Sequence, residues 1–230
     1  MNGLKRLRRL SVVVAERLGL YVRRYLEYFR IVVLMLAVLV RHMKRNCVVM
    51  ELGCANGWLT RSIARHCGLA IGIDIAPSRK WTRDRGINVE FIVADARFLP
   101  IRSNVISFVV ALSLLEHVAR WSMVVSEAFR VLKRSALLVV QIPNLMYFIE
   151  PHTHFPLLGF LPNKLRTTLA QNMCCEVHFD CTIRNVVKVL ENYDFKYWVI
   201  FYYHTFHILL KLFAPSYFII ALKRNKGYMI

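Results

Sequence analysis

The feature that most constrains the fold is the alternation of short apolar runs with segments of helical periodicity. We predict strands at Cys47–Leu52, Leu69–Ile73, Asn88–Val93, Val105–Leu112, Ala136–Ile142, Phe195–Phe201 and Tyr217–Leu222. We predict helices at Trp58–His66, Trp121–Leu132, Ile183–Asn192 and His204–Phe213, and a further helix that begins near Pro77. Strands that alternate with helices form βαβ units, so the sequence predicts an α/β fold whose sheet is mostly parallel.

The chain divides into regions of different character. Residues 46–222 carry the alternating pattern, but residues 145–181 are interrupted by prolines and are expected to form a lid. Residues 1–45 are expected to be a basic helical extension, and residues 223–230 a basic tail. Of the net charge of +18, residues 1–46 contribute +9, from eleven Lys and Arg minus two Glu. Such a segment suits a phosphate-bearing partner, either RNA or an anionic membrane surface.

Two apolar stretches lack the length or uniformity of a membrane span. Ile31–Val40 has ten residues, whereas a spanning helix needs about 20. Trp198–Leu222 is interrupted by Lys211 and Pro215. We interpret both stretches as buried or interfacial elements. Because no signal-peptide pattern is present, the sequence predicts a cytoplasmic location, with peripheral membrane contact left open.

The cysteines do not have the spacing of a disulfide framework. Cys174, Cys175, His178 and Cys181 lie close together in the sequence and could chelate zinc. No matching Cys-x-x-Cys pair stands elsewhere in the chain, and thiols on one short segment are more often buried as small apolar groups. We therefore expect no metal site.

Three acidic residues fall at or just beyond predicted strand ends, namely Glu51, Asp74 and Asp95. Ligands of an open parallel sheet bind at this edge. Each residue has a function if the ligand is S-adenosylmethionine. The glycine-rich turn that follows Glu51 lets the backbone approach the amino-acid portion, and Asp74 can accept hydrogen bonds from both ribose hydroxyls. Asp95 can accept one from the adenine amino group, while the Ala96 amide donates to a ring nitrogen.

These motifs resemble those of the type-11 group of small methyltransferases. The segments that carry the resemblance are Val48–Gly57, Ile71–Asp74, Ala94–Pro100, Leu114–Val118 and Val131–Lys133 with Leu138–Asn144. The resemblance implies the Rossmann-like fold of class I methyltransferases, with a seven-stranded sheet and helices on both faces, and S-adenosylmethionine as cofactor. It also implies that Ser113 lies against the sulfonium. The predicted cofactor-binding residues are Glu51, Gly53, Ala55, Gly57, Asp74, Ile75, Asp95, Ala96 and Ser113.

The sequence departs from the family pattern at four turns. Ala55 stands where the family usually has glycine, and Ser107 replaces an aspartate common before the fourth strand. Residues 134–136 replace a Pro-Gly-Gly turn, and Asp194 stands where glycine usually precedes the sixth strand. None of these departures removes a predicted cofactor ligand.

The predicted lid offers candidates for proton transfer to or from an acceptor. His152 and His154 lie between prolines and near Glu150, so either imidazole could serve as a general base. His117 follows the fourth predicted strand and is a weaker candidate. The segment after that strand lacks the Asn/Asp-Pro-Pro-aromatic tetrad and the Pro-Cys nucleophile, which argues against two kinds of nucleobase methylation.

The preferred function is methylation of a small-molecule or lipid-like acceptor at a membrane surface, because the N-terminal segment mixes basic and apolar residues. One alternative is an RNA methyltransferase that binds phosphates through the basic segment. Another is an inactive Rossmann module that binds a partner.

Overall fold

The computed structural model describes residues 46–82, 88–144, 158–172, 177–201 and 216–224. These residues form a seven-stranded sheet in the order β3-β2-β1-β4-β5-β7-β6. Its strands are β1 (Val48–Leu52), β2 (Leu69–Asp74), β3 (Val89–Val93), β4 (Ile106–Leu112), β5 (Leu132–Pro143), β6 (Phe195–Phe201) and β7 (Ser216–Lys223). β7 is antiparallel to both of its neighbours, and the other pairs are parallel. The predicted Rossmann-like α/β class is confirmed.

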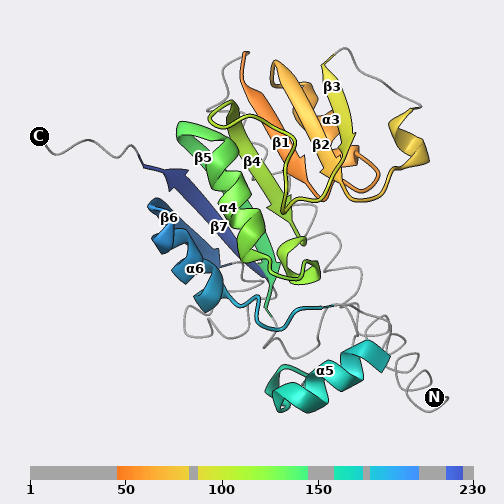
Figure 1. The fold of residues 1–230 in the computed structure, drawn as a ribbon, viewed down its shortest axis with the longest axis vertical. Helices are drawn as coiled ribbons and strands as arrows, with labels where there is room; N and C mark the ends of the chain where they lie inside the picture. The colour runs from red at the N-terminus through yellow and green to blue at the C-terminus, as the bar shows by residue number, and fades with distance from the viewer. Residues whose placement is uncertain (1–45, 83–87, 145–157, 173–176, 202–215, 225–230) are drawn as a thin grey trace, which may run out of the picture.

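Helices cover both faces of the sheet (Figure 1). The helices are α3 (Trp58–Ala64), α4 (Ser122–Val131), α5 (Asn163–Asn172) and α6 (Ile183–Asn192), with short 3-10 turns η1 (Arg79–Trp81), η2 (Leu115–His117) and η3 (Leu158–Phe160). α3 buries Leu59 and Ile63, one turn apart, in the core of one face. α4 and α6 bury their apolar residues in the larger core of the other face.

The order of the strands fixes where a ligand can bind. β1 pairs with β2 on one side and with β4 on the other, so the loops after β1 and β4 leave the sheet at a point where the strand order reverses. Leu52 is in register with Ile73 of β2 and with Ala111 of β4. The three strands therefore end at the same level, and such a switch point is where open α/β sheets bind ligands.

Two elements differ from the sequence expectation near the sheet. β5 begins at Leu132 rather than Ala136, because the chain passes directly from α4 into an irregular pairing with β4. Ser135, with φ of 57°, lies within this irregular part. After Pro77 the described chain forms η1 rather than a full helix.

The predicted lid contains an element that the sequence reading overlooked. α5 begins directly after Pro162, and Leu165 and Leu169 stand four residues apart on it. Figure 1 shows α5 beyond the end of the sheet at which the parallel strands terminate. Several prolines around the helix obscured its periodicity.

Some predictions lie outside the described residues. They concern the basic extension over 1–45, the helix His204–Phe213, the tail from residue 225 onward, and the first part of the lid. No helix within the described ranges is both long and apolar enough to cross a membrane.

Candidate functional site

The turn after β1 brings the chain back over the end of β2. The amides of Gly53 and Cys54 donate to the Ile73 carbonyl at 2.8 and 3.0 Å. Gly53 has φ of 75°, a conformation that favours glycine. A Cβ atom at Gly53 would lie 3.0 Å from Cδ1 of Leu114. This position therefore favours glycine, because a side chain would be strained at this φ and Leu114 would have to shift by a few tenths of an ångström.

Asp74 closes the other side of this turn. Its Oδ2 accepts from the Ala55 amide at 2.8 Å, and its Oδ1 accepts from the Ala76 amide at 3.1 Å. The Ala55 carbonyl accepts from Nε1 of Trp81 at 2.9 Å. A carboxylate has about four acceptor positions, so the orientation of Asp74 is fixed while capacity for two ligand hydroxyls remains.

Glu51 lies beneath the turn rather than in the ligand cavity. It is 7% exposed, and its Oε2 accepts a hydrogen bond from the Thr60 hydroxyl. Burial raises the pKa of Glu51 to about 7, although the Thr60 hydrogen bonds oppose the shift. Its role in cofactor binding stays a prediction, and its position indicates support of the turn from below.

Asp95 is held by an arginine that the sequence analysis did not select. Nε and Nη2 of Arg97 donate to the Asp95 carboxylate, with the shortest contact at 2.6 Å, and the Arg97 amide donates to Oδ1 at 2.8 Å. The hydrogen bonds from Arg97 lower the pKa of Asp95, so the carboxylate stays ionised. The signal was available, since Arg97 stands two residues after the aspartate in the motif at 94–100.

Ser113 makes hydrogen bonds along the end of the sheet. Its hydroxyl donates to Oε1 of Gln141 at 2.6 Å, and Nε2 of Gln141 donates to the Ser216 hydroxyl at 3.1 Å. Gln141 is 2% exposed within the otherwise apolar end of β5. Ser113 is not among the residues that line the cavity described next, and its predicted contact with the sulfonium stays a prediction.

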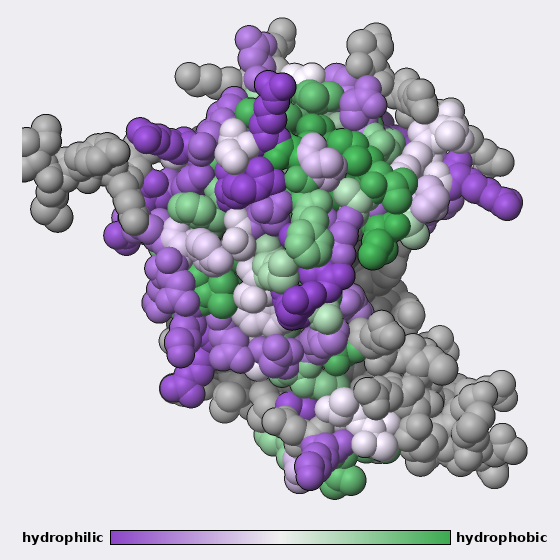
Figure 2. Space-filling model, in the orientation of Figure 1, coloured by the Kyte–Doolittle hydropathy of each residue, from purple (hydrophilic) through white to green (hydrophobic). Residues whose placement is uncertain are grey.

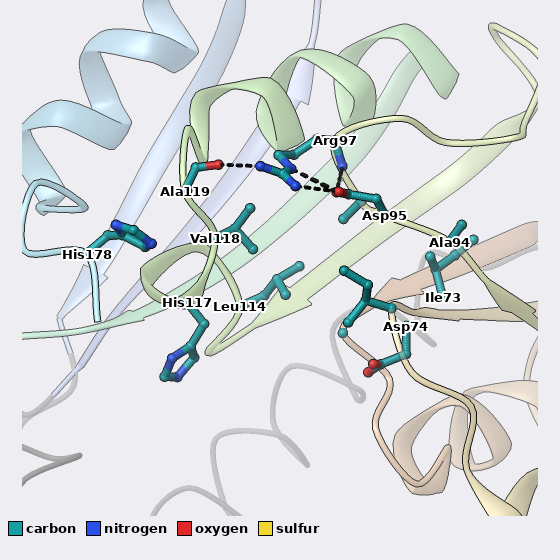
Figure 3. Close-up of a pocket in the computed structure, with 13 residues that line it drawn as sticks. Ile73, Asp74, Ala94, Asp95, Arg97, Leu114, His117, Val118, Ala119 and His178 are labelled. Atoms are coloured by element: carbon teal, nitrogen blue, oxygen red, sulfur yellow. Dashed lines mark hydrogen bonds and ion pairs between the residues drawn. The ribbon is translucent and has the colours of Figure 1, made fainter. Parts of the chain in front are cut away.

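A cavity of about 340 Å³ opens at this edge of the sheet (Figure 3). Roughly 300–1,000 Å³ is usual for a ligand pocket. The predicted cofactor residues that line it are Gly53, Asp74, Ile75, Asp95 and Ala96. Ala55 and Gly57 lie in the turn beside it. The lining also includes Arg97, Leu114, His117 and His178.

The structure describes two other sets of candidates only in part. His152 and His154 lie outside the described residues, as do Cys174 and Cys175. Cys181 is fully buried, and its pKa is raised by desolvation and by the nearby Glu116 and Asp180 carboxylates. Within the ranges that the structure describes, no group of three or more His, Cys, Asp or Glu side chains could hold a metal ion.

The cavity fits S-adenosylmethionine in three respects. The Gly53 backbone, at a φ that favours glycine, can receive the amino-acid portion, Asp74 retains acceptor capacity for the ribose, and Asp95 lies just beyond the next strand end. When bound, the cofactor supplies an electrophilic methyl group on a sulfonium. The fold and this cavity define a class I S-adenosylmethionine-dependent methyltransferase.

Comparison with known proteins gives the same class. Residues 50–140 match the family model described as a methyltransferase domain. The predicted resemblance to the type-11 group is thereby confirmed over these residues. No curated protein matches the sequence.

Solved structures share the fold at low sequence identity. A methyltransferase from Mesorhizobium loti is 15% identical, with a TM-score of 0.62 over 80% of this chain and 95% of that one. Magnesium protoporphyrin IX methyltransferase from Synechocystis is 17% identical, with a TM-score of 0.58 over 85% of this chain and 82% of that one. Geranyl diphosphate C-methyltransferase from Streptomyces coelicolor is 13% identical, with a TM-score of 0.56 over 83% of this chain and 78% of that one.

Proposed function

We propose that the enzyme methylates a small-molecule or lipid-like acceptor at a membrane surface. The observation that carries this proposal is a set of exposed apolar side chains beside the cavity. Ile75 is 70% exposed and lines the cavity, and Val93 and Phe98, at 54% and 60%, directly adjoin lining residues in the chain. Exposed apolar side chains gathered at one site are typical of a surface that meets an apolar ligand or a membrane.

The surface of the described residues carries further apolar side chains in this part of the molecule. Figure 2 shows hydrophobic residues, among hydrophilic ones, over the part of the view in which Figure 1 draws β1, β2 and β3. The two structural relatives named for their acceptors act on a porphyrin and a prenyl diphosphate. Both acceptors have large apolar bodies, which supports the same acceptor class for this enzyme.

The basic extension supplies the second part of the proposal. Residues 1–46 carry a net charge of +9, and each basic residue near an anionic membrane surface contributes about 1 kcal/mol of attraction. Apolar residues beside the cavity and a basic segment in the same chain would together dock the enzyme on anionic lipid.

The acceptor class can be tested by labelling. The full chain is incubated with methyl-labelled S-adenosylmethionine and a cell extract, which is then separated into lipid and small-molecule, RNA and protein fractions. We expect label in the lipid and small-molecule fraction, and roughly 30- to 150-fold slower labelling by the Asp74→Ala variant at low cofactor concentration. Label in RNA would instead establish the RNA alternative, and cofactor binding without any label would favour the inactive module.

Docking can be tested with vesicles. Phe98→Ser should reduce co-sedimentation with vesicles that contain anionic lipid. The matched control is Trp198→Ser, which removes a 47% exposed aromatic residue from β6 at the opposite edge of the sheet. Binding of the wild type should fall with added salt, since the basic residues are screened. Equal effects of the two substitutions would contradict a docking role for the cavity side.

A further inference from the structure

The cavity has two chemically different ends. Figure 3 shows Asp74 and Asp95 on one side, and His117 and His178 on the other. His117 ends η2, directly after β4, and is exposed. His178 comes from the segment before α6, far from His117 in the sequence. Both imidazoles line the same cavity as the predicted cofactor residues.

The segment that carries His178 is fixed to η2 by hydrogen bonds. The His178 amide donates to the Glu116 carbonyl at 2.7 Å. Nε1 of Trp121, at the start of α4, donates to Oδ2 of Asp180 at 3.2 Å. These two contacts hold the segment against the chain that follows β4, so the fold places both histidines at the same cavity.

The chemistry of the cofactor indicates which end its methyl group faces. Its sulfur joins the ribose to the amino-acid portion, so the methyl group lies between the groups that bind these two parts. Asp74 provides the ribose contact and Gly53 the backbone for the amino-acid portion, while Leu114 lies against Gly53. His117 stands three residues after Leu114 and is the first titratable side chain that lines the cavity beyond it.

We propose that His117 accepts the proton of a hydroxyl acceptor and that His178 binds the acceptor beside it, an inference that rests on the function proposed above. The acceptor oxygen forms a bond to the methyl carbon as the carbon–sulfur bond breaks and its electron pair passes to sulfur. The hydroxyl proton passes to the neutral imidazole of His117, which becomes imidazolium and later releases the proton to solvent. This base is the weaker candidate of the sequence analysis, whereas His152 and His154 lie outside the described residues.

Charged groups lie around this cavity as well. Asp74 and Asp95 line the cavity after β2 and β3, and Arg97 neutralises Asp95. Glu116 is buried next to His117, and Arg120 follows η2. A carboxylate favours the imidazolium form and a cation disfavours it. Because the cofactor sulfonium is a cation, it should favour neutral His117, the form that can accept a proton.

The test compares the imidazole pKa values in two complexes of the wild-type enzyme. S-adenosylmethionine carries one positive charge more than S-adenosylhomocysteine, and the charge resides on sulfur. We expect the pKa of His117, followed by NMR, to be about 1 unit lower in the S-adenosylmethionine complex, from a charge several Å away in a partly solvated site. His66, which follows α3 at the other end of β2, is the internal control and should not shift.

The variants His117→Gln and His178→Gln assign the two signals and extend the test to turnover. With the fraction that takes up label, His117→Gln should lower kcat about 100-fold and remove the acid limb of the pH profile. Affinity for S-adenosylhomocysteine should change less than about threefold. Equal His117 pKa values in the two complexes, or loss of the acid limb in His152→Ala instead, would overturn the assignment. Failure of both ligands to bind would count against the function itself.

Discussion

The two ends of the cavity are built in different ways. The cofactor end comes from three loops that follow β1, β2 and β3, and its residues lie between positions 53 and 97 of the chain. Backbone amides fix Asp74, and Arg97 fixes Asp95. The acceptor end combines His117 with His178, which packing brings together. The proposed cofactor site is thus encoded within one stretch of the sequence, whereas the proposed acceptor site depends on contact between distant segments.

The largest effect at the cofactor end of the cavity is expected from Gly53→Val. A β-branched side chain is strained at φ of 75° and would meet Leu114. We expect at least about 1,000-fold weaker cofactor binding by calorimetry, or about 4 kcal/mol. The control is Gly68→Val, at an exposed glycine before β2 whose φ is not positive. Near-normal binding by Gly53→Val would show that this turn does not hold the cofactor.

Glu51, beneath the turn after β1, should make the free energy of unfolding depend on pH. The pKa of Glu51 is raised from 4.5 to about 7 in the folded state. The folded chain therefore holds a proton that the unfolded chain releases, and the free energy of unfolding falls as pH rises between these values, by about 3 kcal/mol in all. Above the folded-state pKa the loss is complete and the dependence levels off.

Urea unfolding of the wild type and of Glu51→Gln at pH 5 and pH 8 measures this effect. The variant has no carboxyl to titrate and should lack this part of the pH dependence. An unchanged profile in the variant would mean that Glu51 is ionised in both states. Because this group titrates near the range of imidazole, stability must be measured beside turnover to keep Glu51 distinct from His117.

The ribose contact is tested by Asp74→Ala. Loss of a carboxylate that accepts from two hydroxyls should cost about 2–3 kcal/mol, or roughly 30- to 150-fold in the dissociation constant. The variant also loses the acceptor for the Ala55 and Ala76 amides, so circular dichroism must show that it folds. Glu90→Ala, which removes an exposed carboxylate from β3, is the control. Unchanged affinity in folded Asp74→Ala would refute the ribose assignment.

Much of the fold could be predicted because apolar runs mark buried strands directly. The predicted and observed bounds of β6 and α6 are identical, and those of β1 and β3 differ by one residue. β5 could not be bounded because its first residues, Leu132–Ser135, form an irregular pairing that depends on the register with β4. α5 was missed because prolines on both sides suggested an irregular segment.

The site divides in the same way. Gly53, Asp74 and Asp95 could be selected from the sequence because each stands at a strand end within a motif. The contact between His178 and η2 could not, since nothing in the local sequence indicates that this segment returns to the chain after β4. Gln141 could be noticed in the sequence as a polar residue within an apolar strand. Its hydrogen-bond partners, Ser113 and Ser216, could not be predicted, because they depend on how the strands pair.

Substitution of Arg97 tests whether adenine binding depends on the fixed orientation of the Asp95 carboxylate. Three N–H groups of Arg97 already donate hydrogen bonds to the Asp95 carboxylate. About one acceptor position is left for the adenine amino group. Arg97→Ala should free the carboxylate to rotate and weaken cofactor binding about 3- to 10-fold, since the pair is partly exposed and worth little. Arg97→Lys keeps the positive charge but loses the forked guanidinium geometry, so its cofactor affinity should lie between those of the wild type and Arg97→Ala. Tighter binding by Arg97→Ala would show that Arg97 competes with the ligand.

The smallest expected effect concerns Ala55, the residue at which the first motif departs from the family pattern. Its φ of 45° lies in the left-handed region, which costs a residue with a Cβ atom about 1–2 kcal/mol. Ala55→Gly relieves that cost but gives the unfolded chain about 0.4–1 kcal/mol more conformational entropy. The net expectation is a gain of about 0.5 kcal/mol in the free energy of unfolding. Cofactor affinity should not change, because the Ala55 backbone contacts to Asp74 and Trp81 remain.

The matched control is Ala128→Gly in α4, where φ is not positive. That variant has no strain to relieve, and it should lose more than about 1 kcal/mol, because glycine in a helix costs that much and the buried methyl group of Ala128 is also removed. Opposite signs for the two substitutions would show that the motif tolerates alanine at a cost in strain. Equal losses would mean that Ala55 is not strained in solution, and that the turn adopts its left-handed conformation without the help of glycine at this position.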